Sequence, residues 1–172
     1  MSFLWAMKNV IWLIAAFFVS LSGICQTDPV QAPYKRFPSV PPLKLLLADS
    51  TSFFTKDDLQ KKRPVMVMLF SPDCEHCQHE MEQIIKNIDA FEKTQLILST
   101  TRDFDNMVEF IKRYQLDRFE NIIVGKDVGY MLPVFYNIRN LPFLAFYNRQ
   151  KELISVFEGT MPVEKMIAEL KK

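Results

Sequence analysis

The sequence contains few of the side chains that build metal sites. It has three cysteines and two histidines, and four of these five residues lie in one stretch as Cys74, His76, Cys77 and His79. On a helix, at about 100° per residue, His79 points almost opposite to Cys77, and His76 is well round from Cys74. A closed four-ligand site would therefore need ligands from elsewhere, and the remaining cysteine is Cys25. We assign no metal and no cofactor here, and we give His79 no role.

The sequence also lacks an excess of positive charge. Its 21 Lys and Arg residues nearly balance its 20 Asp and Glu residues, and no long basic run appears. Nucleic-acid-binding proteins need concentrated positive charge, so we expect no nucleic acid partner. No internal repeat or low-complexity tract is present. About half the residues are apolar, at 49%, and a chain of this length is typical of one domain with extra segments.

The first apolar run, residues 10–21, is too short for a comfortable membrane span, which takes about 20 residues. It follows Lys8, as in a secretory signal peptide. Gly23 and Cys25 are small residues at the two positions that a signal peptidase reads, so residues 1–25 are predicted to be removed. Two alternatives stay open: residues 1–25 remain as an anchor, or Cys25 carries a lipid. All three predict the periplasm or another extracytoplasmic space, where disulfides persist.

The rest of the chain divides into a tether and a domain. Residues 26–42 are polar and carry five prolines, which predicts an extended tether with little regular structure. Residues 43–172 alternate between apolar strand patterns and helical patterns. We expect strands near 43–48, 65–70, 96–99, 122–124, 143–147 and 153–157. We expect helices from Thr55 to about 63, at 74–91, from 103 onward, near 129–136 and after Thr160.

This order predicts the α/β class. The early strands are separated by helices, which indicates parallel βαβ units, and the last two strands form an antiparallel hairpin followed by a helix. The expected domain is therefore a mixed central sheet with helices on both faces.

The stretch Cys74-Glu75-His76-Cys77 carries the chemistry. It follows a buried strand and begins an amphipathic helix. Backbone N–H groups at a helix N-terminus stabilise a thiolate, which is the reactive form of cysteine. The pattern favours a redox dithiol that forms a Cys74–Cys77 disulfide over a metal site or an inert pair. Cys74 leads the helix and is the expected nucleophile, while Cys77 lies deeper and would resolve a mixed disulfide.

Three neighbouring side chains are candidates for tuning the dithiol. His76 either carries a partial positive charge that stabilises the Cys74 thiolate or is an ordinary solvated residue. The negative charge of Glu75 would oppose that stabilisation. Glu80 lies one turn beyond Cys77, so it is either an exposed helix residue or a group that exchanges a proton with the Cys77 thiol.

From Leu43 to the C-terminus the sequence resembles the thioredoxin-like superfamily. The resemblance is carried by the Cys-x-x-Cys motif at a strand–helix junction, by the segment Tyr136–Phe143 ending in a candidate cis-proline, and by Gly159 after the hairpin. With the signal segment and tether, the chain is most similar to exported TlpA/ResA-type thiol–disulfide oxidoreductases. The resemblance implies that Leu141 and Pro142 bind substrate beside the sulfurs.

Some residues match this group and others depart from it. Glu80 matches an acidic position found in the group. Asp73 stands where the family usually has Trp, Met68 where thioredoxin has a buried Asp, and His76 where Pro often occurs. These departures bear on substrate choice and redox direction rather than on the fold.

The resemblance implies a monomeric disulfide reductase with protein disulfides or dithiols as substrates and a membrane-embedded electron donor. The alternative is a thioredoxin-fold copper chaperone for an exported oxidase, which is not an enzyme. Thiolates and imidazoles suit copper, but the distal histidine expected of such proteins is absent.

Overall fold

The computed structural model describes residues 31–172. The predicted signal segment, its anchor and lipid alternatives, Cys25 and the first part of the expected tether lie outside the described residues. Ala32–Lys172 form one compact unit. In the part of the chain that the structure describes, no helix is both long and apolar enough to cross a membrane.

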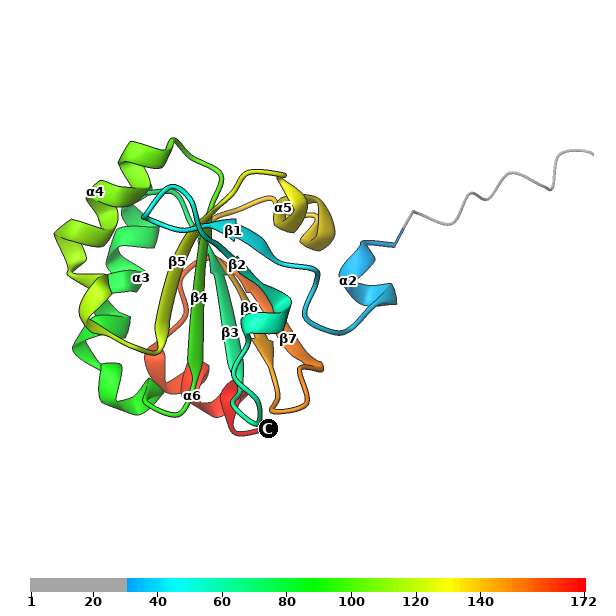
Figure 1. The fold of residues 1–172 in the computed structure, drawn as a ribbon. Coiled ribbons are helices and arrows are strands. Elements are labelled where there is room, and N and C mark those ends of the chain that lie inside the picture. The colour runs from blue at the N-terminus through cyan, green and yellow to red at the C-terminus, as the bar shows by residue number, and fades with distance from the viewer. Residues whose placement is uncertain (1–30) are drawn as a thin grey trace, which may run out of the picture. The chain divides into compact units, whose positions relative to one another are not determined.

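Seven strands form one mixed sheet in the order β2-β1-β5-β4-β3-β6-β7 (Figure 1). The central three run parallel to one another: β3 (Val65–Leu69), β4 (Gln95–Thr100) and β5 (Ile122–Asp127). On one side the antiparallel hairpin completes the sheet: β6 (Phe143–Tyr147) and β7 (Leu153–Glu158). On the other side lie two short antiparallel strands: β1 (Lys44–Leu46) and β2 (Phe53–Thr55). The predicted mixed sheet and C-terminal hairpin are confirmed.

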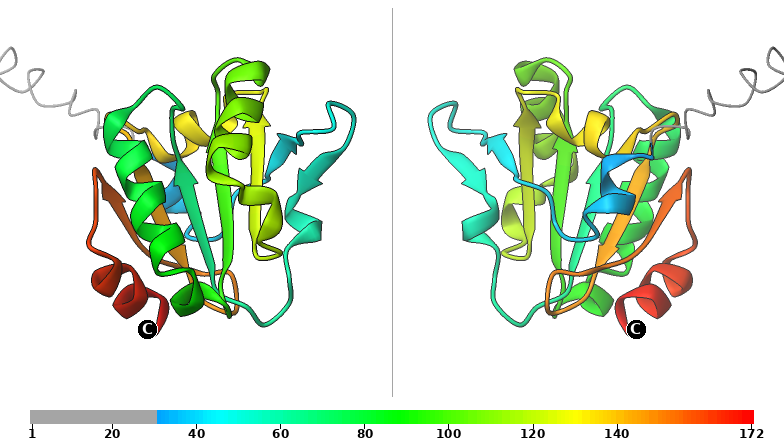
Figure 2. Two further views of the ribbon diagram at one scale, coloured as in Figure 1. Left: turned by 90° about the vertical axis from the view of Figure 1, so that its left-hand side faces the viewer. Right: turned by 90° about the vertical axis from the view of Figure 1, so that its right-hand side faces the viewer.

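Helices cover both faces of this sheet, as predicted (Figure 2). Because β3, β4 and β5 follow one another across the sheet in one direction, right-handed crossovers place their connecting helices on the same face. These are α3 (Glu75–Lys86) and α4 (Phe104–Tyr114), and α6 (Val163–Leu170) packs on the same core cluster. The opposite face is covered by α2 (Pro33–Arg36) and α5 (Met131–Tyr136). Among residues 31–172 there are also three 3₁₀ turns: η2 (Lys56–Asp58), η3 (Ile88–Phe91) and η4 (Leu116–Arg118).

The helix expected from Thr55 to about 63 is wrong. The predicted capping pair does form, since Asp58 Oδ2 accepts hydrogen bonds from Thr55 N at 2.7 Å and from Thr55 Oγ1 at 2.8 Å. However, the pair caps only the 3₁₀ turn η2. Lys62 has a φ of 61°, in the left-handed region that a right-handed helix does not contain. The segment after Leu59 is therefore an exposed loop leading to β3.

The first and last elements also differ from the sequence-based expectation. Strand β1 runs antiparallel to β5 rather than as part of a parallel unit, and β2 was not predicted because just one of its three residues is buried. The last helix begins at Val163, after Pro162, rather than at Thr160. A residue that precedes proline is kept out of helical conformation by steric contact with the proline ring, so the helix cannot extend through Met161.

Residues 32–42 belong to the folded unit, whereas an extended tether with little regular structure was expected there. The short helix α2 lies in this segment, and the ring of Tyr34 is 6.1 Å from that of Tyr136. Val40 is buried and donates its N–H to the carbonyl of Lys151 at 3.1 Å. The apolar side chains between the prolines supply this burial, which proline content alone does not reveal.

Candidate active site

The Cys-x-x-Cys motif lies where the central strand ends. All five residues of β3 are buried, and four further residues lead to the first cysteine. Cys74 is the N-cap residue of α3, and its Sγ accepts a hydrogen bond from the Cys77 N–H at 3.3 Å. A negative charge on this sulfur is therefore stabilised by a direct donor as well as by the N-terminal end of the helix.

The two cysteines differ in exposure. Cys74 is half-buried, while Cys77 is fully buried on the sheet side of α3. Burial raises the pKa of the Cys77 thiol far above its usual range, and hydrogen bonding to Cys74 adds to this effect. The backbone N–H of Ser71 acts in the opposite direction and lowers the Cys77 pKa. The accessible thiol is thus Cys74, and Cys77 is held in its neutral form.

Glu80 is buried, with 1% of its surface exposed, so the exposed-helix interpretation is wrong. Its Oε1 accepts the Met161 N–H at 2.9 Å. Burial raises the pKa of the Glu80 carboxyl, while the Met161 N–H and the charge of His79 lower it. The Glu80 charge in turn contributes to the raised pKa of Cys77. Helical spacing contained this signal, because Glu80 falls on the same stripe as the buried residues of α3, which are Cys77, Met81 and Ile84.

The other candidate side chains of the motif point to solvent. Glu75, His76 and His79 are all exposed. Water and salt screen charges in such positions, so any effect of His76 and Glu75 on the Cys74 sulfur is small. Their tuning roles remain predictions.

The loop before β6 meets the motif, although it is distant in sequence. The Leu141–Pro142 peptide bond is cis, and the Leu141 carbonyl accepts a hydrogen bond from the Cys74 thiol at 3.9 Å. The structure therefore brings together the motif and both residues that the resemblance assigned to substrate binding.

Glu158, at the end of β7, holds this loop from the other side. Its carboxylate accepts hydrogen bonds from Arg139 N at 3.2 Å and from Asn140 Nδ2 at 3.0 Å. The next residue, Gly159, donates its N–H to the Pro142 carbonyl at 2.7 Å and has a φ of 99°, which favours glycine. Gly159 could be singled out from its place after the hairpin, but no sequence pattern pointed to Glu158.

Ser71 and Arg102 form a second contact that sequence reasoning missed. The Ser71 carbonyl accepts the Cys74 N–H at 3.1 Å, and the Ser71 hydroxyl accepts a hydrogen bond from Arg102 Nε at 2.9 Å. The two residues are 31 positions apart and meet because they follow the neighbouring parallel strands β3 and β4. Ser71 thus connects Arg102 to the backbone of the motif.

The geometry of the motif offers few ligands for copper. Between residues 31 and 172, no group of three or more His, Cys, Asp or Glu side chains is arranged to hold a metal ion. Cys74 and Cys77 supply two sulfurs, and the two histidines of the motif are exposed.

The comparisons with known proteins give the fold. No protein-family model and no curated protein matches the sequence. Among solved structures, dsbF from Mycobacterium tuberculosis aligns with a TM-score of 0.64 at 17% identity over 77% of this chain and 98% of that one. A secreted M. tuberculosis disulfide oxidoreductase homologous to E. coli DsbE aligns with a TM-score of 0.62 at 17% identity over 74% of this chain and 93% of that one. StoA from Bacillus subtilis aligns with a TM-score of 0.58 at 18% identity over 77% of this chain and 98% of that one. Together with the sheet order, the motif at the end of β3 and the cis-proline beside it, these similarities show that the chain has a thioredoxin-like fold.

Proposed function

We propose that this protein is a thiol–disulfide oxidoreductase that uses Cys74 and Cys77 as its redox pair. The observation that carries the proposal is the position of the Cys74 sulfur, 3.3 Å from the Cys77 N–H and 3.9 Å from the Leu141 carbonyl. An accessible thiol lies at a helix N-terminus, its partner thiol lies one turn further on, and a loop backbone lies beside the accessible thiol. The structural neighbours named as disulfide oxidoreductases support the same activity.

The reduction of a substrate disulfide then proceeds in two exchanges. The Cys74 thiolate attacks one substrate sulfur, which forms a mixed disulfide and releases the other substrate sulfur as a thiolate. Cys77 loses its proton and attacks the Cys74 sulfur, which forms the Cys74–Cys77 disulfide and releases the second substrate thiolate. The two released thiolates take up protons. Two electrons pass from the protein dithiol to the substrate, and an electron donor must later return them.

We infer that Glu80 accepts the proton of Cys77. Burial keeps the Cys77 thiol neutral in the resting protein, so the second exchange needs a base. The Glu80 carboxyl has a pKa raised by burial, which brings it closer to the working pH and makes it a better proton acceptor than an exposed glutamate. Held by the Met161 N–H, it stays one helical turn from the thiol.

The redox direction, the cellular location and the partners of the protein belong to the same proposal. We assign the protein as an exported disulfide reductase acting on protein substrates as a monomer, with a membrane-embedded electron donor. The resemblance to TlpA/ResA-type proteins and the secreted M. tuberculosis neighbour support this assignment. A reductase is expected to equilibrate near the potential of thioredoxin, at about −270 mV, rather than near that of an oxidant such as DsbA, at about −120 mV.

Cysteine variants test the activity. Cys74→Ser is expected to abolish reduction of a protein disulfide, whereas Cys77→Ser is expected to accumulate a mixed disulfide that mass spectrometry detects, because the resolving thiol is gone. The double variant is the control and must trap nothing. Trapping by Cys74→Ser and not by Cys77→Ser would reverse the roles, and full activity in both single variants would exclude the proposed pair. Equilibration of the wild-type protein with glutathione then measures its reduction potential, which shows whether it acts as a reductant or as an oxidant.

A further inference from the structure

Positively charged side chains cluster at the end of the sheet opposite the redox motif. Here β3 begins, and Val65 pairs with Tyr147 of β6. The loop before β3 and the turn between β6 and β7 meet at this end. Lys151 joins them, because its Nζ donates to the carbonyls of Gln60 at 2.8 Å and Arg63 at 2.6 Å. The five residues of β3 separate this end from the motif by about 17 Å, at about 3.3 Å per residue.

Basic side chains surround an open cavity of about 380 Å³ at this end. They come from three segments: η2, the loop before β3 and the β6–β7 turn. We call this cluster the basic pole and define it by its charged lining residues, which are Lys56, Asp57, Lys61, Lys62, Arg149 and Lys151. Five of the six are cations, so the lining of this cavity carries an excess of positive charge.

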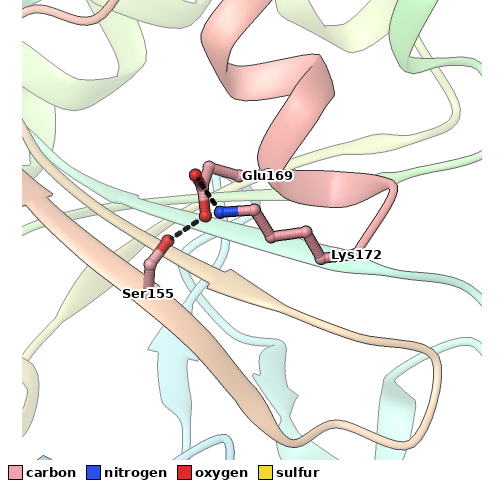
Figure 3. Close-up of polar contacts among 3 residues, drawn as sticks. All are labelled: Ser155, Glu169 and Lys172. Atoms are coloured by element: carbon pink, nitrogen blue, oxygen red, sulfur yellow. Dashed lines mark hydrogen bonds and ion pairs between the residues drawn. The ribbon is translucent and has the colours of Figure 1, made fainter.

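Ion pairs do not neutralise these cations. Across residues 31–172 the structure contains one ion pair, between Lys172 and Glu169, and Glu169 also accepts a hydrogen bond from Ser155 (Figure 3). Lys151 is partly buried, and burial lowers the pKa of its ammonium group. A cation that is removed from water and contacts only neutral carbonyls is stabilised when an anion approaches it.

We propose that the basic pole binds the phosphate groups of an anionic lipid surface, which leaves the redox motif facing away from that surface. The exposed cations are spread over three turns around an open cavity, which suits many phosphates in one plane better than one small anion held by converging donors. Within the folded unit the chain passes beside this pole after α2, because Leu153 N donates to the Pro38 carbonyl at 2.9 Å.

The expected strength follows from general electrostatics. A basic residue near an anionic membrane contributes about 1 kcal/mol, which is about fivefold in affinity per residue. Removing two of the five cations is therefore expected to weaken binding roughly twenty-five-fold. The attraction falls off within a Debye length of about 10 Å at 0.1 M salt, so added salt must weaken it as well.

Vesicle sedimentation with the full chain tests the proposal. The quantity to measure is the gain in binding when phosphatidylglycerol is added to phosphatidylcholine vesicles, since this difference cancels any lipid contact of the N-terminal segment. Lys61→Gln/Lys62→Gln is expected to lose most of this gain. Lys126→Gln/Arg139→Gln removes the same charge at the motif end of the sheet, and is expected to keep the gain. Because the basic pole is remote from Cys74, Lys61→Gln/Lys62→Gln is also expected to reduce disulfides at the wild-type rate, which separates this test from that of the redox activity.

Several outcomes would overturn the proposal. Equal losses in both double variants would mean that net charge, and not the basic pole, attracts lipid. An unchanged gain in Lys61→Gln/Lys62→Gln would exclude the pole altogether. Inorganic phosphate that binds tightly and displaces the protein from vesicles would identify a small-anion site instead, and preference for an RNA oligonucleotide over vesicles would identify a different class of partner.

Discussion

Glu158 offers the sharpest test of how the loop beside the redox motif works. The Glu158 carboxylate holds Arg139 and Asn140, directly before the cis peptide whose carbonyl contacts the Cys74 thiol. Glu158→Ala removes both bonds, and we expect it to slow the reduction of protein disulfides. The reason is that the loop must be in place when the substrate approaches Cys74.

The size of the effect can be worked from these contacts. Two exposed hydrogen bonds contribute about 0.5–1 kcal/mol each, so Glu158→Ala is expected to cost about 1–2 kcal/mol of the free energy of unfolding. If the whole loss falls on the ordered loop, the population of the competent loop drops by about fivefold to thirtyfold, since about 1.4 kcal/mol is a factor of ten. We therefore expect the rate constant for a protein disulfide to fall by up to about thirtyfold.

Glu152 provides a matched control at the other end of the same strand. Its Oε2 accepts a hydrogen bond from Asn148 Nδ2 at 2.8 Å, in the turn remote from the motif. Glu152→Ala is expected to lower the urea midpoint slightly and to leave the rate unchanged. Glu158→Gln keeps one acceptor oxygen and no charge, and is expected to retain most of the rate. The assays are urea unfolding and the reduction of insulin.

The reasoning is refuted if Glu152→Ala and Glu158→Ala slow the reaction equally, because the effect would then be global. It is also refuted if Glu158→Ala is less stable than the wild type but still reduces protein disulfides at the full rate. A rate in Glu158→Gln as low as in Glu158→Ala would assign the effect to the lost charge rather than to the hydrogen bonds.

Three further predictions concern the motif and its surroundings. Because burial raises the pKa of Glu80, its contribution to stability is present at low pH and lost as pH rises through that pKa. The urea midpoint of Glu80→Gln should therefore rise relative to that of the wild type as pH increases. Ultraviolet absorbance should show that the variant forms the Cys77 thiolate at a lower pH. A constant difference between the two midpoints would contradict this. His76→Ala should make the disulfide harder to reduce, by about 30 mV or less, when equilibrated with glutathione, and no change would return it to a solvated role. Arg102→Ala and Ser71→Ala should slow exchange equally and non-additively in a double-mutant cycle, and additive losses would exclude the proposed contact.

The motif and the order of elements from β3 onward could be predicted because their signals are local. The buried strand, the helical spacing after it and the two cysteines all lie within residues 65–91. The β6–β7 hairpin could be predicted for the same reason, since two apolar runs flank a polar turn.

What could not be predicted depends on partners distant in sequence. The donor that satisfies the buried Glu80 carboxyl is the N–H of Met161, which is 81 positions away. The contact of Arg102 with Ser71 arises only once β3 and β4 pair. The fold of residues 32–42 depends in the same way on Tyr136 and Lys151, so composition alone predicted a tether there.

The position of β3 has a consequence for the motions of the site. This strand is buried throughout and hydrogen-bonded on both sides, to β4 and β6. Amides in such a strand exchange with solvent mainly on global unfolding. The loop of residues 137–142 is partly exposed and held by a few side-chain bonds, so its amides should exchange through local opening. Cys74 follows this slowly exchanging strand after four residues, whereas the backbone facing it lies in a loop that exchanges faster, so we expect different substrates to be accommodated mainly by movement of the loop.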